Sequence, residues 1–413
     1  MTYIKPEKTA NQSRLVRKIL AAGFQAGQQQ DWQTVIQQLQ LLPMRKIEHH
    51  KRFILDSEDW QMAFELALSV LLEADFQYQW AIAKLLPLFG SQIIAPLSIL
   101  VEDEQLWVEI RWFICQILGS FPEESVILTL VQLLQSTTDN ELIAIAGKTL
   151  IKIGDRAIDS LRDLLSQPEY SLLATKSLSY IRTAATIAPL LSVTTHENAE
   201  IRAIAINALG SFHDRRVPTV LIAALKDRAS QVRQEAAIAL GFRPDICQEF
   251  ELVKHLQPLL RDLNLEVCRE VAIALGRMQQ ETANTALFEV LQADTTPISL
   301  KTDLIKALSW SNLDSGITYL GMTLQNAGEL IIRETVTALG RTRNSQLKPL
   351  ASQVLSNLWR EQQLFSTQVR QMIATALGEL RDPTARPILE SLAKDSDRKV
   401  QLHALSALRK LSQ

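Results

Sequence analysis

The sequence is poor in cysteine and has no long apolar run. Its three cysteines, Cys115, Cys247 and Cys268, are too few and too scattered over 413 residues for a disulfide framework, which favours a reducing cytosol. No run approaches the roughly 18 uninterrupted apolar residues of a membrane span, and the first residues lack the apolar core of a signal peptide. We therefore expect a soluble, cytoplasmic protein without a transmembrane segment.

The sequence also lacks an excess of charge of either sign. It contains 43 Lys and Arg against 45 Asp and Glu, so the net charge is −2 and the pI is about 6.4. A nucleic-acid-binding domain is normally strongly basic, and no nucleic-acid partner is expected.

What the sequence does contain is one short pattern repeated many times. Residues 232–241 read Val-Arg-Gln-Glu-Ala-Ala-Ile-Ala-Leu-Gly, with apolar residues at i, i+4, i+7 and i+8 on one helical face. Gly241 stands where a helix often ends in a left-handed residue. The pattern recurs every 28 to 38 residues, and its leucines are Leu85, Leu118, Leu150, Leu178, Leu209, Leu240, Leu275, Leu308, Leu339, Leu377 and Leu408.

Each copy carries a second apolar segment upstream, for example at 217–225, 252–260, 286–291 and 386–393. No sustained period-two alternation indicates strands. Because one such helix pair cannot bury its own apolar side, the copies must stack. The sequence predicts an all-α solenoid, a superhelix of about eleven helix-turn-helix repeats over residues 58–413.

Residues 1–57 differ from the repeats and are predicted to form a helical extension with a basic linker. Helices are expected at 12–30 and 32–42, the second stopped by Pro43. The linker is either solvated or a surface for an acidic partner, and its basic residues are Arg45, Lys46, His49, His50, Lys51 and Arg52.

Two stretches carry a family resemblance. Residues 201–218 contain Ile-Arg-Ala-Ile-Ala-Ile-Asn-Ala-Leu-Gly and the turn Asp-Arg-Arg-Val-Pro, and residues 377–387 read Leu-Gly-Glu-Leu-Arg-Asp-Pro-Thr-Ala-Arg-Pro. They resemble the short HEAT repeats of the phycobilisome-lyase type, and the resemblance covers about 330 residues. It implies a right-handed superhelix whose second helices line the concave surface. It also implies a photosynthetic bacterium, although this repeat serves many functions.

Charged residues recur at fixed repeat positions. Arginines follow the first apolar residue of several second helices (Arg111, Arg202, Arg233 and Arg370), and aspartates lie in the loops before several of them (Asp103 before Arg111, Asp227 before Arg233 and, less well placed, Asp262 near Arg269). They predict a structural ladder of Asp–Arg contacts between adjacent repeats. A second position is acidic in later repeats, including Glu235 and Asp303, and apolar in early ones, including Trp80, Phe113, Ile145 and Leu173. We interpret it mainly as packing between repeats, and a division into two functional halves is the alternative.

Positions opposite the apolar stripe are the candidates for function. On the concave face implied by the resemblance, the basic residues are expected to have few acids among them. The predicted partner-binding residues are Lys148, Lys176, Arg269, Lys306, Arg333, Gln234 and Trp112. The hypothesis is that they bind an acidic protein or a carboxylate-bearing ligand; ordinary solvated charges are the alternative.

Catalytic motifs are missing. The sequence has no glycine-rich phosphate loop, Gly-x-Ser-x-Gly or His-Glu-x-x-His, and its histidines do not combine with cysteines at metal-site spacing. The di-iron site of deoxyhypusine hydroxylases, a related HEAT family, uses repeated His-Glu pairs, and only His196-Glu197 matches. Cys247 and Cys268 fall in neighbouring repeats and could approach one another, but buried thiols are the better interpretation. No catalytic residue, metal or cofactor is predicted.

Two functions remain open. The first is a scaffold or assembly factor that grips an acidic partner, which the resemblance suggests is a phycobiliprotein or another photosynthetic-complex protein. The alternative is a phycobilin lyase or lyase subunit, which would hold the propionates of a bilin on basic residues and attach the tetrapyrrole to phycobiliprotein cysteines.

Overall fold

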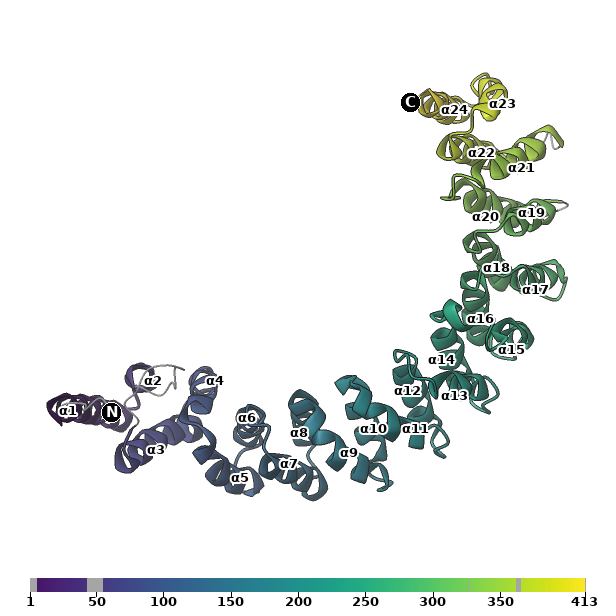
Figure 1. Ribbon diagram of the computed structural model, residues 1–413. Helices are drawn as coiled ribbons and strands as arrows, with labels where there is room; N and C mark the ends of the chain where they lie inside the picture. The colour runs from purple at the N-terminus through teal and green to yellow at the C-terminus, as the bar shows by residue number, and fades with distance from the viewer. Residues whose placement is uncertain (1–5, 43–54, 326, 362–364, 413) are drawn as a thin grey trace. The chain divides into compact units, whose positions relative to one another are not determined.

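The computed structural model describes residues 6–42, 55–325, 327–361 and 365–412, and every regular element within these ranges is a helix (Figure 1). The chain forms two compact units, Met1–Pro189 and Leu190–Gln413. We describe each unit by itself.

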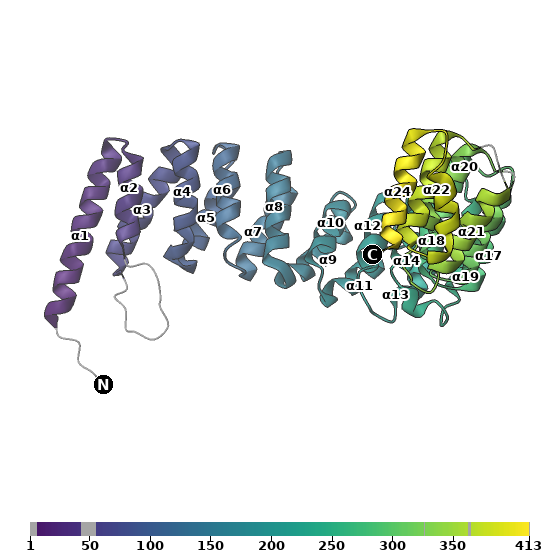
Figure 2. The same cartoon turned by 90° about the horizontal axis from the view of Figure 1, so that it is seen from above.

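In the N-terminal unit, from α3 onward, helices alternate between two rows. The second helices α4, α6, α8 and α10 contact one another in sequence, and Figure 2 shows them side by side. Short 3-10 helices follow α4, α8 and α10. The α-helices are α1 (Pro6–Gln28), α2 (Trp32–Leu41), α3 (Ser57–Glu73), α4 (Phe76–Leu85), α5 (Ile94–Glu102), α6 (Val108–Leu118), α7 (Glu124–Ser136), α8 (Asn140–Ile153), α9 (Ile158–Leu165) and α10 (Ser171–Ile181).

The C-terminal unit repeats this arrangement with α12, α14, α16, α18, α20, α22 and α24 in the second row. Helix α11 contains the boundary between the units. The α-helices are α11 (Ile187–Ser192), α12 (Ala199–Leu209), α13 (Val217–Ala224), α14 (Ser230–Gly241), α15 (Leu252–Leu256), α16 (Leu265–Arg277), α17 (Glu281–Gln292), α18 (Ile298–Trp310), α19 (Asp314–Thr323), α20 (Glu329–Gly340), α21 (Lys348–Glu361), α22 (Thr367–Leu380), α23 (Arg386–Leu392) and α24 (Arg398–Leu411).

The described residues from α3 to α24 form eleven helix pairs, so the predicted all-α solenoid and its repeat number are confirmed. The repeated leucine is buried in every pair except the last, where Leu408 is half-buried. The predicted helix at 252–260 is instead split into α15 and a 3-10 helix, Gln257–Arg261. Pro258 lies in the first turn of this 3-10 helix, where its missing N–H costs no helical hydrogen bond.

Gly241 allows close packing between two helices and does not form the helix cap that the sequence predicts. It is the last residue of α14 with an ordinary negative φ, so the expected left-handed cap is wrong. A Cβ added at Gly241 would lie 3.0 Å from the Cβ and 3.1 Å from the Cα of Ala274 on α16. The glycine is therefore needed because the next second helix approaches so closely.

The predicted Asp–Arg ladder exists, with corrected partners. Arg202 donates two hydrogen bonds of 2.7 Å to the carboxylate of Asp227 in the loop before α14, so the expected pairing of Asp227 with Arg233 is wrong. Asp262 likewise accepts two of 2.7 Å from Arg233 and not from Arg269, because each loop contacts the preceding second helix.

Arg370, near the C-terminus, forms the same kind of pair with an aspartate, whereas Arg111, in the N-terminal unit, does not pair with the aspartate expected for it. Arg370 binds Asp395 with hydrogen bonds of 2.9 and 3.1 Å. Arg111 instead donates to the carbonyl of Val101 at 2.8 Å, so its expected pairing with Asp103 is wrong.

Helices α1 and α2 pack on α3 within the N-terminal unit. The predicted basic linker, with Arg45, Lys46, His49, His50, Lys51 and Arg52, lies outside the described residues. In the part of the chain that is described, no single helix is long and apolar enough to cross a membrane. Phe76–Phe89 and Ser91–Glu102, which are bent by 116°, meet that criterion only as a pair.

Candidate partner-binding surface

The second helices of the N-terminal unit combine exposed aromatic rings and lysines. Phe76 and Trp80 lie one turn apart on α4, and Trp112 lies on α6. The ring centroids of Phe76 and Trp80 are 6.2 Å apart, and those of Trp80 and Trp112 are 6.5 Å apart with the ring planes at 23°. We call Phe76, Trp80 and Trp112 the aromatic patch.

Phe113 forms the buried base of the aromatic patch. Its ring centroid lies 5.4 Å from that of Phe76 and 5.2 Å from that of Trp112, and only 1% of the residue is exposed. Phe76 is 62% exposed and Trp80 is 41% exposed, whereas Trp112 is half-buried. Part of this aromatic surface therefore faces solvent.

Lysines extend this face along the row. The Nζ of Lys84 lies 5.1 Å from the centroid of the Trp80 ring, within the range of a cation–π interaction. The predicted residues Lys148 on α8 and Lys176 on α10 are exposed. Glu109 and Glu141, in the first turns of α6 and α8, are the acidic residues of these four second helices. Lys84 thus shares its helix with no acidic residue, and Lys148 lies two turns from Glu141 on α8.

The C-terminal unit has a different charge pattern. Arg269 binds Glu266 at 2.7 Å and Asp303 at 3.0 Å, and Asp303 also binds Lys306 at 3.3 Å. The expectation of few acids among the predicted basic residues is therefore wrong for Arg269 and Lys306. Their charges are largely balanced within the protein.

The two other predicted residues of the C-terminal unit, Gln234 and Arg333, are half-buried. The Nε of Arg333 is buried without a hydrogen-bond partner among the described residues. The seven predicted residues thus fall into two groups, with Trp112, Lys148 and Lys176 in the N-terminal unit and the rest in the C-terminal unit.

The sequence interpretation missed Phe76, Trp80 and Lys84. It treated Trp80 as packing between repeats because the equivalent residues are Phe113, Ile145 and Leu173. Phe76, Trp80 and Lys84 are spaced four residues apart, which places them on one helical face. That spacing was the signal available in the sequence.

The cysteines are buried, as expected. Burial raises the pKa of the thiols of Cys247 and Cys268, and it raises that of Cys115 to about 12. Cys268 donates a hydrogen bond from Sγ to the carbonyl of Asp262 at 3.3 Å. These thiols are consequently poor nucleophiles at neutral pH, because the thiolate is the reactive form.

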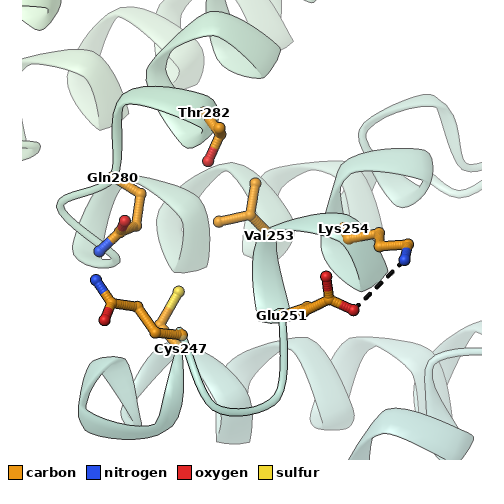
Figure 3. A pocket seen from close by; sticks show the side chains of 7 residues that line it. Cys247, Glu251, Val253, Lys254, Gln280 and Thr282 are labelled. Carbon is orange, nitrogen blue, oxygen red and sulfur yellow. Dashed lines mark hydrogen bonds and ion pairs between the residues drawn. The ribbon is translucent and has the colours of Figure 1, made fainter.

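Cys247 lines an open pocket of about 280 Å³ in the C-terminal unit (Figure 3). Gln280 lies near the thiol, and Glu251 pairs with Lys254 at 3.4 Å on the other side of Val253. Gln248 also lines the pocket. The described residues hold no group of three or more His, Cys, Asp or Glu side chains suited to a metal ion. His196 instead accepts a hydrogen bond of 3.0 Å from the backbone N–H of Asn198.

Comparison with known proteins identifies the repeat. The family model for HEAT repeats matches residues 166–241, 217–309 and 359–413. The chain is also 38% identical over 92 residues to the bilin biosynthesis protein MpeU of Synechococcus sp. (strain WH8020), a segment that makes up 21% of this chain and 30% of that relative. The match thus spans less than a third of the relative's length.

The solved structure of importin beta supports the fold. Importin beta aligns with 98% of this chain and 65% of its own, at 14% identity and a TM-score of 0.51. An engineered protein aligns with 78% of this chain and 99% of its own, at 20% identity and a TM-score of 0.41. At these identities the likeness concerns architecture alone. The repeated helix pairs, their Leu-Gly pattern and the matching family model show that this chain is a HEAT-repeat protein.

Proposed function

We propose that this HEAT-repeat protein is a scaffold or assembly factor that holds an acidic protein on its second helices. The proposal rests on the exposed Lys148, which lies on a helix whose acidic residue is confined to the first turn. A row of stacked helices offers many weak contacts over a long surface, which suits the capture of a folded protein.

A phycobiliprotein is the proposed partner. The support comes from the relative named for bilin biosynthesis and from the phycobilisome-lyase type of repeat that the sequence resembles. Another protein of a photosynthetic complex with an acidic surface would fit the same face. Long-range attraction between the lysines and such a surface would be strongest at low ionic strength.

The experiment measures binding of the purified chain to a purified phycobiliprotein at low and high salt. We expect Lys148→Glu to weaken low-salt binding severalfold. Lys306→Glu is a comparison with the same change of charge, and it should weaken binding less because Asp303 already balances this cation. Absence of binding by the wild type, or equal losses in the two variants, would contradict the proposal.

The alternative is a bilin lyase or a lyase subunit, and the name of the relative favours it. The lysines of the N-terminal unit would then bind the bilin propionates, and the reacting thiol would belong to the phycobiliprotein. Co-expression with an apo-phycobiliprotein and bilin separates the two functions. Covalent, zinc-fluorescent adduct above the spontaneous level supports a lyase, whereas binding without adduct supports a scaffold.

A further inference from the structure

The aromatic patch is more exposed than packing within the solenoid requires. Phe113 already fills the space between α4 and α6 and is almost fully buried, whereas Phe76 and Trp80 keep 62% and 41% of their surface exposed. The positions equivalent to Trp80 on α8 and α10 hold Ile145, which is buried, and Leu173, which is half-buried. Clustered, exposed aromatic rings are typical of interaction sites.

The surroundings of the patch restrict what can occupy it. Lys84 holds a positive charge against the Trp80 ring, and α4 contains no acidic residue. The nearby acidic residues are Asp75, the N-cap residue of α4, and Glu109, in the first turn of α6. Both lie at the N-terminal ends of their helices, whereas Lys84 lies in the last turn of α4. An apolar group alone would leave Lys84 without a counter-charge, and a purely acidic group would leave the rings uncovered.

We propose that the aromatic patch and Lys84 dock an acidic polypeptide segment that carries a bulky apolar side chain. The apolar side chain packs on the exposed faces of Phe76 and Trp80, and a neighbouring carboxylate pairs with Lys84. This inference rests on the proposed function, because it names where and how that function's acidic partner is anchored.

The two kinds of contact act on different steps of binding. Exposed lysines such as Lys148 attract an acidic surface over several ångströms, and salt screens that attraction. Aromatic packing acts only at contact, so its loss raises the dissociation rate and leaves the salt dependence unchanged. The dissociation rate of Phe76→Ala/Trp80→Ala and the salt dependence of binding by Lys148→Glu can therefore separate aromatic anchoring from long-range attraction.

The test uses Phe76→Ala/Trp80→Ala in the full chain. Both side chains are substantially exposed, so we expect the fold to persist, with helical circular dichroism and thermal unfolding as checks. Trp107→Ala is the matched control, because Trp107 is 76% exposed and lies just before α6, outside the patch. The double variant should bind the phycobiliprotein at least tenfold more weakly through faster dissociation, and the control should bind as the wild type does.

A second probe is independent of the phycobiliprotein. It is a synthetic glutamate-rich amphipathic peptide with two leucines on one face, and its binding is followed by tryptophan fluorescence. If this peptide binds the wild type but not Phe76→Ala/Trp80→Ala, while the phycobiliprotein binds neither, the patch is established and the proposed partner is wrong. If both ligands bind the variant with wild-type affinity, the inference is overturned.

Free bilin is the third arm of the test. Loss of bilin binding in the double variant, with peptide and phycobiliprotein binding unchanged, would assign the patch to a tetrapyrrole and would also overturn the inference. Failure of the peptide to bind the wild type would exclude an acidic segment as the occupant.

Discussion

Arg233 and Asp262 form a two-point contact between consecutive repeats, with both hydrogen bonds at 2.7 Å. The same guanidinium donates through Nη1 to the carbonyl of Asp227 at 2.7 Å, and Asp227 in turn accepts two hydrogen bonds from Arg202. One arginine therefore holds both the loop before its own helix, α14, and the loop before the next second helix, α16.

Replacing Arg233 by Met should destabilise the C-terminal unit strongly. The Asp262 carboxylate is only 9% exposed, and breaking such a pair leaves an uncompensated buried charge, which costs about 3–5 kcal/mol. Urea denaturation measures the change. Arg216→Met is the control, because the Arg216 side chain is 52% exposed in its pair with Asp214, and a much smaller change is expected there. If both variants lost the same free energy of unfolding, burial of the Asp262 carboxylate would not be the cause of the destabilisation.

The same contact predicts loss of stability in acid. Burial alone would raise the pKa of Asp262, but hydrogen bonds from Arg233 and from the N–H of Asn264 outweigh it and lower the pKa. Because the folded-state pKa is depressed, the stabilisation is present above the unfolded value of about 3.9 and is lost as pH falls through the folded value. Urea titrations across this acidic range should show a shallower pH dependence for Asp262→Asn than for the wild type. Identical slopes would contradict the assignment.

Asp59 on α3 should have the opposite dependence on pH. It is 1% exposed, neither carboxylate oxygen has a hydrogen-bond partner among the described residues, and the Nε of Arg17 on α1 lies 3.5 Å from its Oδ1. Burial raises its pKa, so ionisation above the unfolded value of about 3.9 destabilises the folded N-terminal unit. We expect Asp59→Asn to increase the free energy of unfolding at pH 7, with the gain vanishing below about pH 4.

The control for Asp59 is Glu58→Gln on the neighbouring position. Its side chain is 79% exposed, so the change should stay within about 0.5 kcal/mol at every pH. Destabilisation by Asp59→Asn at pH 7 would show instead that the ion pair with Arg17 outweighs the burial of the carboxylate.

Gly276→Ala should destabilise the stack of helices by about 1–3 kcal/mol. The added Cβ would lie 2.6 Å from the carbonyl oxygen and 3.0 Å from the Cα of Ala307 on α18, and backbone atoms cannot yield as a flexible side chain can. Gly328→Ala is the control, since its Cβ would meet nothing within 4 Å. Thermal unfolding should show a lower midpoint for Gly276→Ala alone; a similar shift in both variants would exclude a steric cause.

The fold could be predicted because every repeat carries the same physical signal. A buried leucine such as Leu240 and its periodic apolar neighbours define the helix face without any knowledge of long-range contacts. The partner of Asp262 could not be found in this way. Sequence distance favoured Arg269, whereas stacking brings the loop to Arg233 of the preceding repeat.

The candidate surface was harder to predict because exposure and charge pairing depend on neighbouring helices. Trp80 and Phe113 occupy equivalent positions, yet Phe113 is buried while Trp80 is partly exposed. Arg269 and Lys306 looked available because Asp303 was assigned to packing between repeats. In the structure, Asp303 contacts both of them.

The close contact of Gly241 with Ala274 is repeated one unit later by Gly276 with Ala307. The two junctions are alike in that each presents a glycine to an alanine on the following second helix, although the nearest atom is the Cβ of Ala274 in one and the carbonyl oxygen of Ala307 in the other. Removal of residues 242–276 would place Gly241 opposite Ala307 and again pair a glycine with an alanine. Gene duplication or deletion of whole units could thus change the length of this solenoid, and the number of partner contacts, without requiring a new interface.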